Sequence, residues 1–104
     1  MPRRSTRLPT LSAKETLILE LLVARGELYG LELVAASRRR LKRGTVYVTL
    51  GRMVAKGYLA SRLEDGPVDG GGLPRRLYTP TALGRRVLDA WTHAARRLTL
   101  AVAR

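Results

Sequence analysis

The sequence lacks the residues from which many metal and redox sites are built. It contains no cysteine, which excludes disulfide bridges, cysteine-based zinc fingers, iron–sulfur sites and thiol nucleophiles, and fits a reducing compartment. His93 is the single histidine, so a site with several histidine ligands is excluded as well. We therefore expect neither a metal ion nor a cofactor, and we interpret His93 as a solvent-facing or hydrogen-bonded residue.

Acidic residues and long apolar runs are also scarce. Eight Asp and Glu residues stand against twenty Lys and Arg residues, which gives a net charge of +12 at pH 7. The few carboxylates are not paired on any predicted face, so acid–base catalysis lacks its groups and we expect no enzyme. No apolar run approaches the roughly 18 residues that cross a bilayer. The charge attracts polyanions, which makes nucleic acid or an anionic membrane surface the expected partner.

The 104 residues correspond to one small domain with extensions. Residues 1–10 have the arginines but not the apolar stretch of a secretory signal, and we predict a flexible basic arm containing Arg3, Arg4 and Arg7. Residues 11–80 form the predicted folded domain, and residues 81–104 form a C-terminal helix.

Three helices are predicted in the first half of the chain. Ser12 and Glu15 have the spacing of a capping box, and the first helix runs from there to Arg25-Gly26. The second covers Tyr29 to about Ser37. The third begins at Thr45 and stops at Lys56-Gly57. One face of this third helix is apolar and the opposite face is polar and cationic, with Val46, Leu50, Met53 and Val54 on the first and Thr45, Thr49, Arg52 and Lys56 on the second.

A β-hairpin follows. Residues 58–63 alternate as a strand does, and residues 76–79 can be their antiparallel mate. Residues 64–74 read as a loop at the hairpin tip, with a flexible Gly70-Gly71-Gly72 run and with Asp65 and Asp69 expected to lean away from DNA. The last helix starts at Ala82 after a Thr81 cap. This order predicts a mainly α fold with a small β-hairpin, namely a winged helix-turn-helix plus one C-terminal dimerisation helix.

The polar face of the third helix is the candidate reader of the DNA major groove, where the second helix of a helix-turn-helix inserts. Thr45, Tyr47 and Thr49 offer hydroxyl groups, and Val48 could touch a thymine methyl group. The alternative is that this face is merely solvated and that Tyr47 is partly core. The cations expected to contact DNA are Lys42, Arg43, Arg52 and Lys56 on or beside the helix, and Arg75 and Arg76 in the wing, where the pair could also merely solvate a sheet edge.

The last helix carries an apolar stripe with coiled-coil-like spacing. A helix of about five to six turns is longer than this small core can cover, so part of the stripe needs another partner, most simply a second copy. The alternative is that the stripe packs only on its own domain. Trp91 is then a packing anchor or, near a dimer axis, one wall of a slot for a planar ligand. The predicted dimer residues are Leu83, Val87, Trp91, Ala94 and Leu98.

Several segments together resemble the PadR-like transcriptional regulators. They are residues 11–19, residues 28–33, residues 43–53 continuing to Lys56-Gly-Tyr-Leu59, and Gly72-Leu-Pro-Arg-Arg-Leu-Tyr78 with Thr81-Ala-Leu-Gly-Arg85. The resemblance implies a dimeric bacterial repressor of the short type, with one dimerisation helix. It also implies DNA contacts from Gly44-Thr45-x-Tyr47, from Arg75-Arg76 and from Tyr29. In this chain Arg43 stands where the family usually has proline, and Tyr29 precedes Gly30 where the family has its tyrosine after the glycine.

We therefore predict a dimeric, sequence-specific repressor that binds a palindromic operator in double-stranded DNA. A planar small molecule or a partner would relieve repression, and the protein would be cytoplasmic, on the bacterial nucleoid and without membrane contact. The alternative from another class is a nonspecific nucleic-acid-binding architectural protein, which the high charge also favours.

Overall fold

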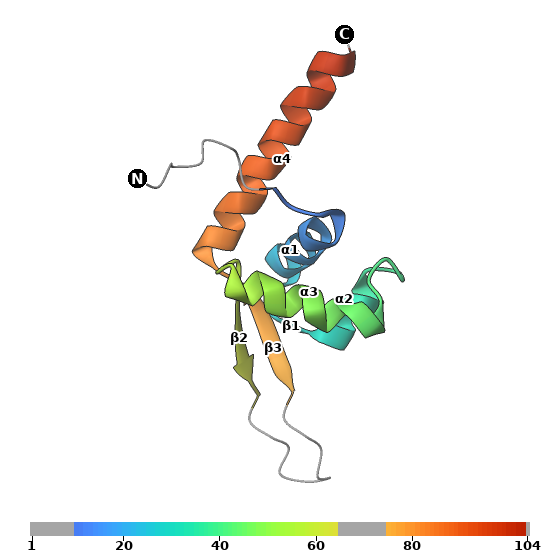
Figure 1. Ribbon diagram of the computed structural model, residues 1–104, viewed down its shortest axis with the longest axis vertical. Coiled ribbons are helices and arrows are strands. Elements are labelled where there is room, and N and C mark those ends of the chain that lie inside the picture. Colours follow the sequence, from blue (N-terminus) through green and yellow to red (C-terminus); the bar gives the residue numbers. More distant parts are fainter. Residues whose placement is uncertain (1–9, 65–74, 104) are drawn as a thin grey trace, which may run out of the picture.

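The computed structural model describes residues 10–64 and 75–103 of the chain. The predictions for the arm, with Arg3, Arg4 and Arg7, and for Asp65, Asp69 and the Gly70–Gly72 run lie outside these residues. The elements in chain order are α1 (Ala13–Arg25), β1 (Leu28–Tyr29), α2 (Gly30–Ala36), α3 (Arg43–Ala55), β2 (Leu59–Leu63), β3 (Arg76–Pro80) and α4 (Ala82–Ala103), arranged as in Figure 1.

Helix α1 begins and ends where its sequence predicts. The Ser12 hydroxyl accepts a hydrogen bond from the Glu15 backbone N–H at 3.1 Å, and the Glu15 carboxylate accepts one from the Ser12 backbone N–H at 2.9 Å. These two bonds satisfy N–H groups that the first helical turn leaves open. At the other end Gly26 has φ 96°, a left-handed conformation that glycine adopts without a steric penalty.

Helix α3 starts two residues earlier than predicted. Lys42 is extended, and its carbonyl accepts from the Val46 backbone N–H at 2.9 Å, so the first turn already includes Arg43 and Gly44. The predicted apolar face of this helix is confirmed, because Val46, Leu50 and Met53 are buried in the core.

The sheet has one strand more than the predicted hairpin. Strands β2 and β3 pair antiparallel, with Ser61 opposite Tyr78, and the two-residue strand β1 pairs with the other edge of β3, with Tyr29 opposite Leu77. The order is therefore β1-β3-β2, and β3 is the central strand. This arrangement ties the segment before α2 directly to the wing.

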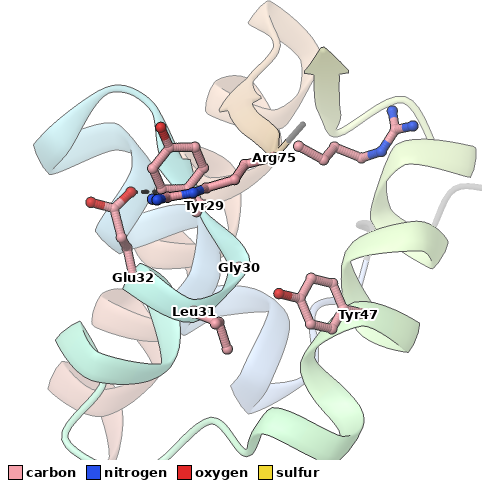
Figure 2. Close-up of a pocket in the computed structure, with 7 residues that line it drawn as sticks. Tyr29, Gly30, Leu31, Glu32, Tyr47 and Arg75 are labelled. Atoms are coloured by element: carbon pink, nitrogen blue, oxygen red, sulfur yellow. Dashed lines mark hydrogen bonds between the residues drawn. The ribbon is translucent and has the colours of Figure 1, made fainter. Parts of the chain in front are cut away.

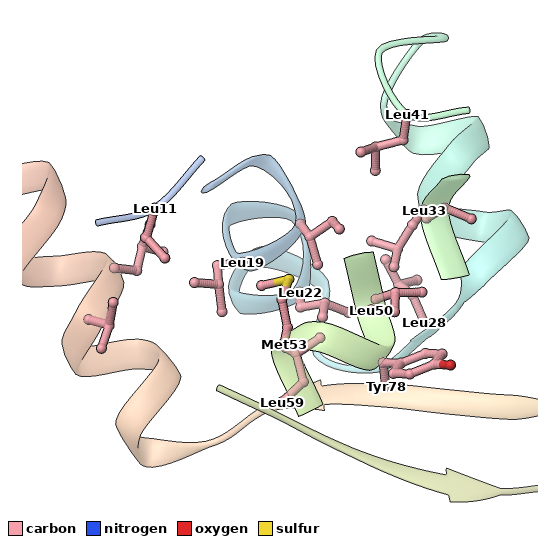
Figure 3. Packing of buried hydrophobic residues seen from close by; sticks show 14 residues of the cluster. Leu11, Leu19, Leu22, Leu28, Leu33, Leu41, Leu50, Met53, Leu59 and Tyr78 are labelled. Carbon is pink, nitrogen blue, oxygen red and sulfur yellow. The ribbon is translucent and has the colours of Figure 1, made fainter. Parts of the chain in front are cut away.

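The core lies between α1, the inner faces of α2 and α3, the sheet, and the first turns of α4 (Figure 3). Ile18, Leu19 and Leu22 of α1 are fully buried at its centre. Since each of these helices contributes only one apolar stripe, their other faces are left for solvent or partners. The fold is a winged helix-turn-helix with one long terminal helix.

Helix α4 covers the core with its first half only. Gly84 is buried where the helix crosses the Tyr58 carbonyl, which a Cβ atom at this position would approach to 2.1 Å. Val87 is 5% exposed and packs in the domain's own core, so its predicted place in a dimer interface is corrected. Figure 1 shows the C-terminal half of α4 projecting away from the domain, and Leu98 in this half is 67% exposed. None of the helices in the described ranges is both long and apolar enough to span a bilayer.

Candidate nucleic-acid interface

The outer face of α3 is open along its length. Thr45 and Arg52 are exposed, Thr49 is half-buried, and the Val48 side chain is 61% exposed although it is apolar. The two threonine hydroxyls make only long hydrogen bonds to the preceding turn, 3.5 Å for Thr45 and 3.4 Å for Thr49. They therefore remain available to an external donor or acceptor.

Beside this face, α2, α3 and the wing enclose an open hollow of about 720 Å³. Figure 2 shows Tyr29 and Arg75 on one side of it and Tyr47 on the other, with Gly30 between them. Four residues that the sequence predicts to contact DNA, Tyr29, Tyr47, Arg75 and Arg76, thus come together from three separate segments. The hollow is also lined by Leu31 and Glu32, which the sequence analysis did not single out.

Tyr29 joins the wing to the start of α2. Its hydroxyl donates a short hydrogen bond to the Glu64 carboxylate just beyond β2, and the Arg75 guanidinium lies 4.8 Å above its ring. Its backbone N–H donates to Glu32 at 2.8 Å, which fixes the first turn of α2. The hydrogen bond to Glu64 stabilises the protonated phenol and raises the pKa of Tyr29. One side chain therefore sets the position of a wing cation relative to the helix-turn-helix.

Tyr47 is 48% exposed, and its ring lies against the backbone of Gly30. A Cβ atom on Gly30 would fall 2.5 Å from the Tyr47 ring, closer than atoms can approach. The absence of a side chain at position 30 thus lets the ring rest beside α2 with its hydroxyl at the hollow, as Figure 2 shows.

The wing cations differ in what holds them. Arg76 donates to the Ser61 hydroxyl of the neighbouring strand at 3.1 Å, while Arg75 stacks on Tyr29. Both arginines are exposed. Lys42 and Arg43 are also exposed, at the start of α3 and on the same end of the helix as Tyr47.

Lys56, another predicted DNA contact, forms an ion pair with α1. Its Nζ atom lies 2.9 Å from the buried Glu15 carboxylate of α1 and 5.8 Å from the centre of the Tyr58 ring. Burial alone would raise the pKa of Glu15, but the hydrogen bonds from Ser12 and Lys56 outweigh it and the pKa is lowered. Lys56 thus helps to hold α3 on α1, and its contact with DNA stays a prediction.

Trp91 and His93 of α4 lie away from this interface. Trp91 is half-buried and packs against the core, which agrees with the packing-anchor interpretation, and it also borders a groove between α1 and α4 of about 400 Å³. His93 is exposed. Within residues 10–64 and 75–103 no three His, Asp or Glu side chains gather where a metal ion could bind.

The profile of the transcriptional regulator PadR-like family matches residues 18–90, which is more than half of the chain. The chain belongs to this family. No match is found among curated protein sequences.

Solved PadR-family structures share the fold. A PadR family transcription regulator from Clostridium difficile is 26% identical with a TM-score of 0.74, covering 88% of this chain and 96% of that one. A PadR family regulator from Eggerthella lenta is 30% identical with a TM-score of 0.71, covering 86% and 77%. Bacillus subtilis PadR, solved in complex with operator DNA, is 24% identical with a TM-score of 0.68, covering 77% of this chain and 46% of that one.

Two features of this PadR-like chain are not predictable from its sequence pattern. Glu64 directly follows β2, and its partner Tyr29 is 35 residues away, so no local pattern could reveal the bond. The start of α2 carries a weak signal, since Glu32 stands three residues after Tyr29 as in a capping box, but tyrosine is not a usual N-cap residue.

Proposed function

We propose that this PadR-like protein is a sequence-specific DNA-binding repressor in which α3 reads the major groove. The observation that carries the proposal is the joint exposure of the Thr45–Thr49 face and of the hollow that Tyr29, Tyr47 and Arg75 line. Hydroxyl groups and an apolar Val48 on one helix face are the means by which side chains distinguish base edges. Cations beside that face suit the flanking phosphates.

The operator complex of Bacillus subtilis PadR supports this function, because the same fold there holds DNA. We extend it to a division of roles within the interface. Tyr47 and Thr49 contact bases, with Thr45 beside them. The phosphate contacts come from Lys42, Arg43, Arg75 and Arg76, while Arg52 stands where it reaches either a phosphate or a guanine.

We also propose that the protein acts as a homodimer on a palindromic operator in the bacterial nucleoid. The support is the far half of α4, where Leu98 and Val102, one helical turn apart on the same face, are exposed apolar side chains on a helix that extends past its own domain. A second copy packed there would bury them and would present two copies of α3 to two half-sites. Leu83 and Ala94, two further predicted dimer residues of the stripe, are exposed and half-buried, respectively.

Relief of repression by a planar effector would use the groove between α1 and α4. Trp91 borders it together with Thr16 and Ala95, and a partner helix across the groove would close it. The aromatic wall suits a flat ligand, and the polar side chains around it, with Glu20 and Arg96 among them, suit polar groups at the ligand's edge. Because Trp91 is the single tryptophan, its fluorescence reports whether such a ligand binds.

Binding-site selection followed by gel-shift titration tests the function. We expect wild-type protein to select one motif and to bind it at least about a thousandfold more tightly than random DNA. Thr49→Ala and Tyr47→Ala should change the preferred base and cost about 1–3 kcal/mol on the selected site. Lys14→Ala, which removes an exposed cation from α1, is the control and should leave the motif unchanged.

A wild-type protein that binds all sequences alike would instead identify a nonspecific architectural binder. An unchanged motif and affinity in both α3 variants would show that this helix does not lie in the groove.

A further inference from the structure

The turn between α2 and α3 carries an unusual concentration of positive charge. Arg38, Arg39 and Arg40 are followed, after Leu41, by Lys42 and Arg43, so five of six consecutive residues are cationic. All five are exposed. The ion pairs found in the described ranges, Lys56 with Glu15 and Arg62 with Glu27, involve none of them. Like charges at this density repel one another unless a polyanion lies against them.

The backbone of this turn is strained where the arginines stand. Arg38 has φ 54° and Arg39 has φ 72°, both in the left-handed region that glycine and asparagine tolerate best. Two successive arginines in that region are unfavourable, and glycine at either position would relax the chain. Strained residues other than glycine persist where the surrounding structure fixes them, and they concentrate at functional sites.

The turn is also fixed firmly at both ends. The Ser37 hydroxyl donates to the Val34 carbonyl at 2.8 Å and accepts from the Leu41 backbone N–H at 2.9 Å. Ser37 and Leu41 are each only 2% exposed, so the turn is anchored in the core on either side. The three arginines thus project from a rigid base, which lowers the entropy that their immobilisation on a partner would cost.

The position of the turn identifies that partner. Figure 1 shows it at the N-terminal end of α3, the end that a recognition helix directs into the groove. Phosphates line both rims of a groove about 12 Å wide, so a cationic turn just outside the helix N-terminus meets the backbone and not the base edges. We propose that Arg38, Arg39 and Arg40 form a further phosphate-binding surface, which extends the DNA interface beyond α3 and the wing.

This inference rests on the proposed function, and its test separates the two. The double variant Arg38→Gly/Arg39→Gly removes two charges and relieves the backbone strain, so its thermal unfolding midpoint should equal or exceed that of wild type. Its slope of log affinity against log salt should nevertheless fall by about one unit for each phosphate that a protomer no longer binds. Measured on random duplex DNA, this slope does not depend on whether an operator exists.

Two controls complete the experiment. Arg38→Lys/Arg39→Lys keeps the charges and should keep most of the slope. Lys14→Ala/Arg25→Ala removes two exposed charges from α1 and should leave the slope near the wild-type value. The selected DNA motif should be the same for all variants, because side chains that bind phosphates do not read bases.

The proposal is overturned if the glycine variant keeps the wild-type salt slope, or if the α1 variant lowers it equally. A changed motif in the glycine variant would likewise overturn it, since the turn would then read bases. If the wild-type protein selected no DNA motif but the glycine variant still lowered the salt slope, the proposed function would be wrong and the phosphate-binding surface would be supported.

Discussion

Gly30 and Tyr47 depend on each other although they lie on different helices. The Tyr47 ring occupies the space that a side chain on residue 30 would fill, with its hydroxyl oxygen 2.9 Å from the position of a Cβ atom. The ring is half-exposed and nothing rigid encloses it, so it can swing aside at small cost to the fold. Its position at the hollow therefore depends on a missing methyl group on its neighbour.

We predict that Gly30→Ala leaves the protein folded but displaces Tyr47. Affinity for the selected DNA site should fall by about 1–3 kcal/mol, the range for removing one side chain that reads a base. Tyr47→Ala should give a similar decrease, and the double variant should be no worse than either single variant, since all three lack the same interaction. Gel-shift titration with thermal melting as a folding control measures this. Additive decreases would mean that Gly30 and Tyr47 act on DNA separately.

At the scale of single residues, the sequence predicts which functional groups lie on a helix face better than it predicts which residues those groups contact. The hydroxyls and cations of α3 and the wing could be named because residue type and helical period determine them. Lys56 is a cation on the same helix face as Arg52, yet it pairs with Glu15, which is 41 residues away in the sequence. Tyr29 likewise forms a hydrogen bond with Glu64 across the central strand. Such pairs are decided by how elements pack, which one helix face does not reveal.

At the scale of elements, Glu15 serves two helices at once. It closes the capping box of α1 through Ser12, and its second oxygen accepts from Lys56 at the end of α3. Its carboxylate is almost fully buried, so loss of either partner leaves charge without compensation. The pair therefore fixes α3 on the core.

We predict that Glu15→Gln lowers the free energy of unfolding by about 1–2 kcal/mol at neutral pH, as for other helix caps that are removed. The pKa of Glu15 is lowered in the folded protein, so its contribution is present above the unfolded pKa and is lost as pH falls through the folded pKa. The stability gap between wild type and variant should thus close in acid. Denaturant unfolding at several pH values measures it.

Glu20→Gln is the matched control, because Glu20 lies exposed on the same helix. It should change stability little and show no such pH dependence. A gap between wild type and Glu15→Gln that stayed constant down to the acid limit would contradict the role of the ionised pair.

Element boundaries were predictable where local chemistry sets them. The Ser12 capping box, Gly26 and Gly57 mark helix ends in the structure as in the sequence, and Gly57 has φ 82°. Strand β1 was not predicted, because two residues carry no alternating pattern and become a strand only by pairing with β3. The sequence predicts the start of α3 two residues too late, because Gly44 reads as an interruption, whereas in the structure the carbonyl of the extended Lys42 already accepts the first helical hydrogen bond.

At the scale of the whole molecule, α4 has an inner half and an outer half. The stripe continues along both, but Val87 and Leu88 face the core while Leu98 and Val102 face solvent. The sequence could not divide the stripe, since the same periodicity serves a helix packed on its own domain and one packed on a partner. The correction at Val87 follows from that ambiguity, and the dimer proposal now depends on the outer half alone.

We predict that Leu98→Glu converts the proposed dimer to a monomer while the winged domain stays folded, because Leu98 is exposed and lies outside the core cluster that a glutamate would disturb. Burying Leu98 from both protomers is worth about 3–6 kcal/mol, so the dimer dissociation constant should rise at least about a hundredfold. Each protomer alone reaches one half-site, and tight binding to a palindrome should collapse to weak, salt-driven association. Analytical ultracentrifugation measures the loss of the dimer, and gel-shift titration measures the loss of tight operator binding.

Leu98→Met, which keeps the apolar surface, is the control and should stay dimeric and bind DNA normally. A Leu98→Glu protein that remained dimeric with full affinity would place the interface between protomers elsewhere than the outer half of α4.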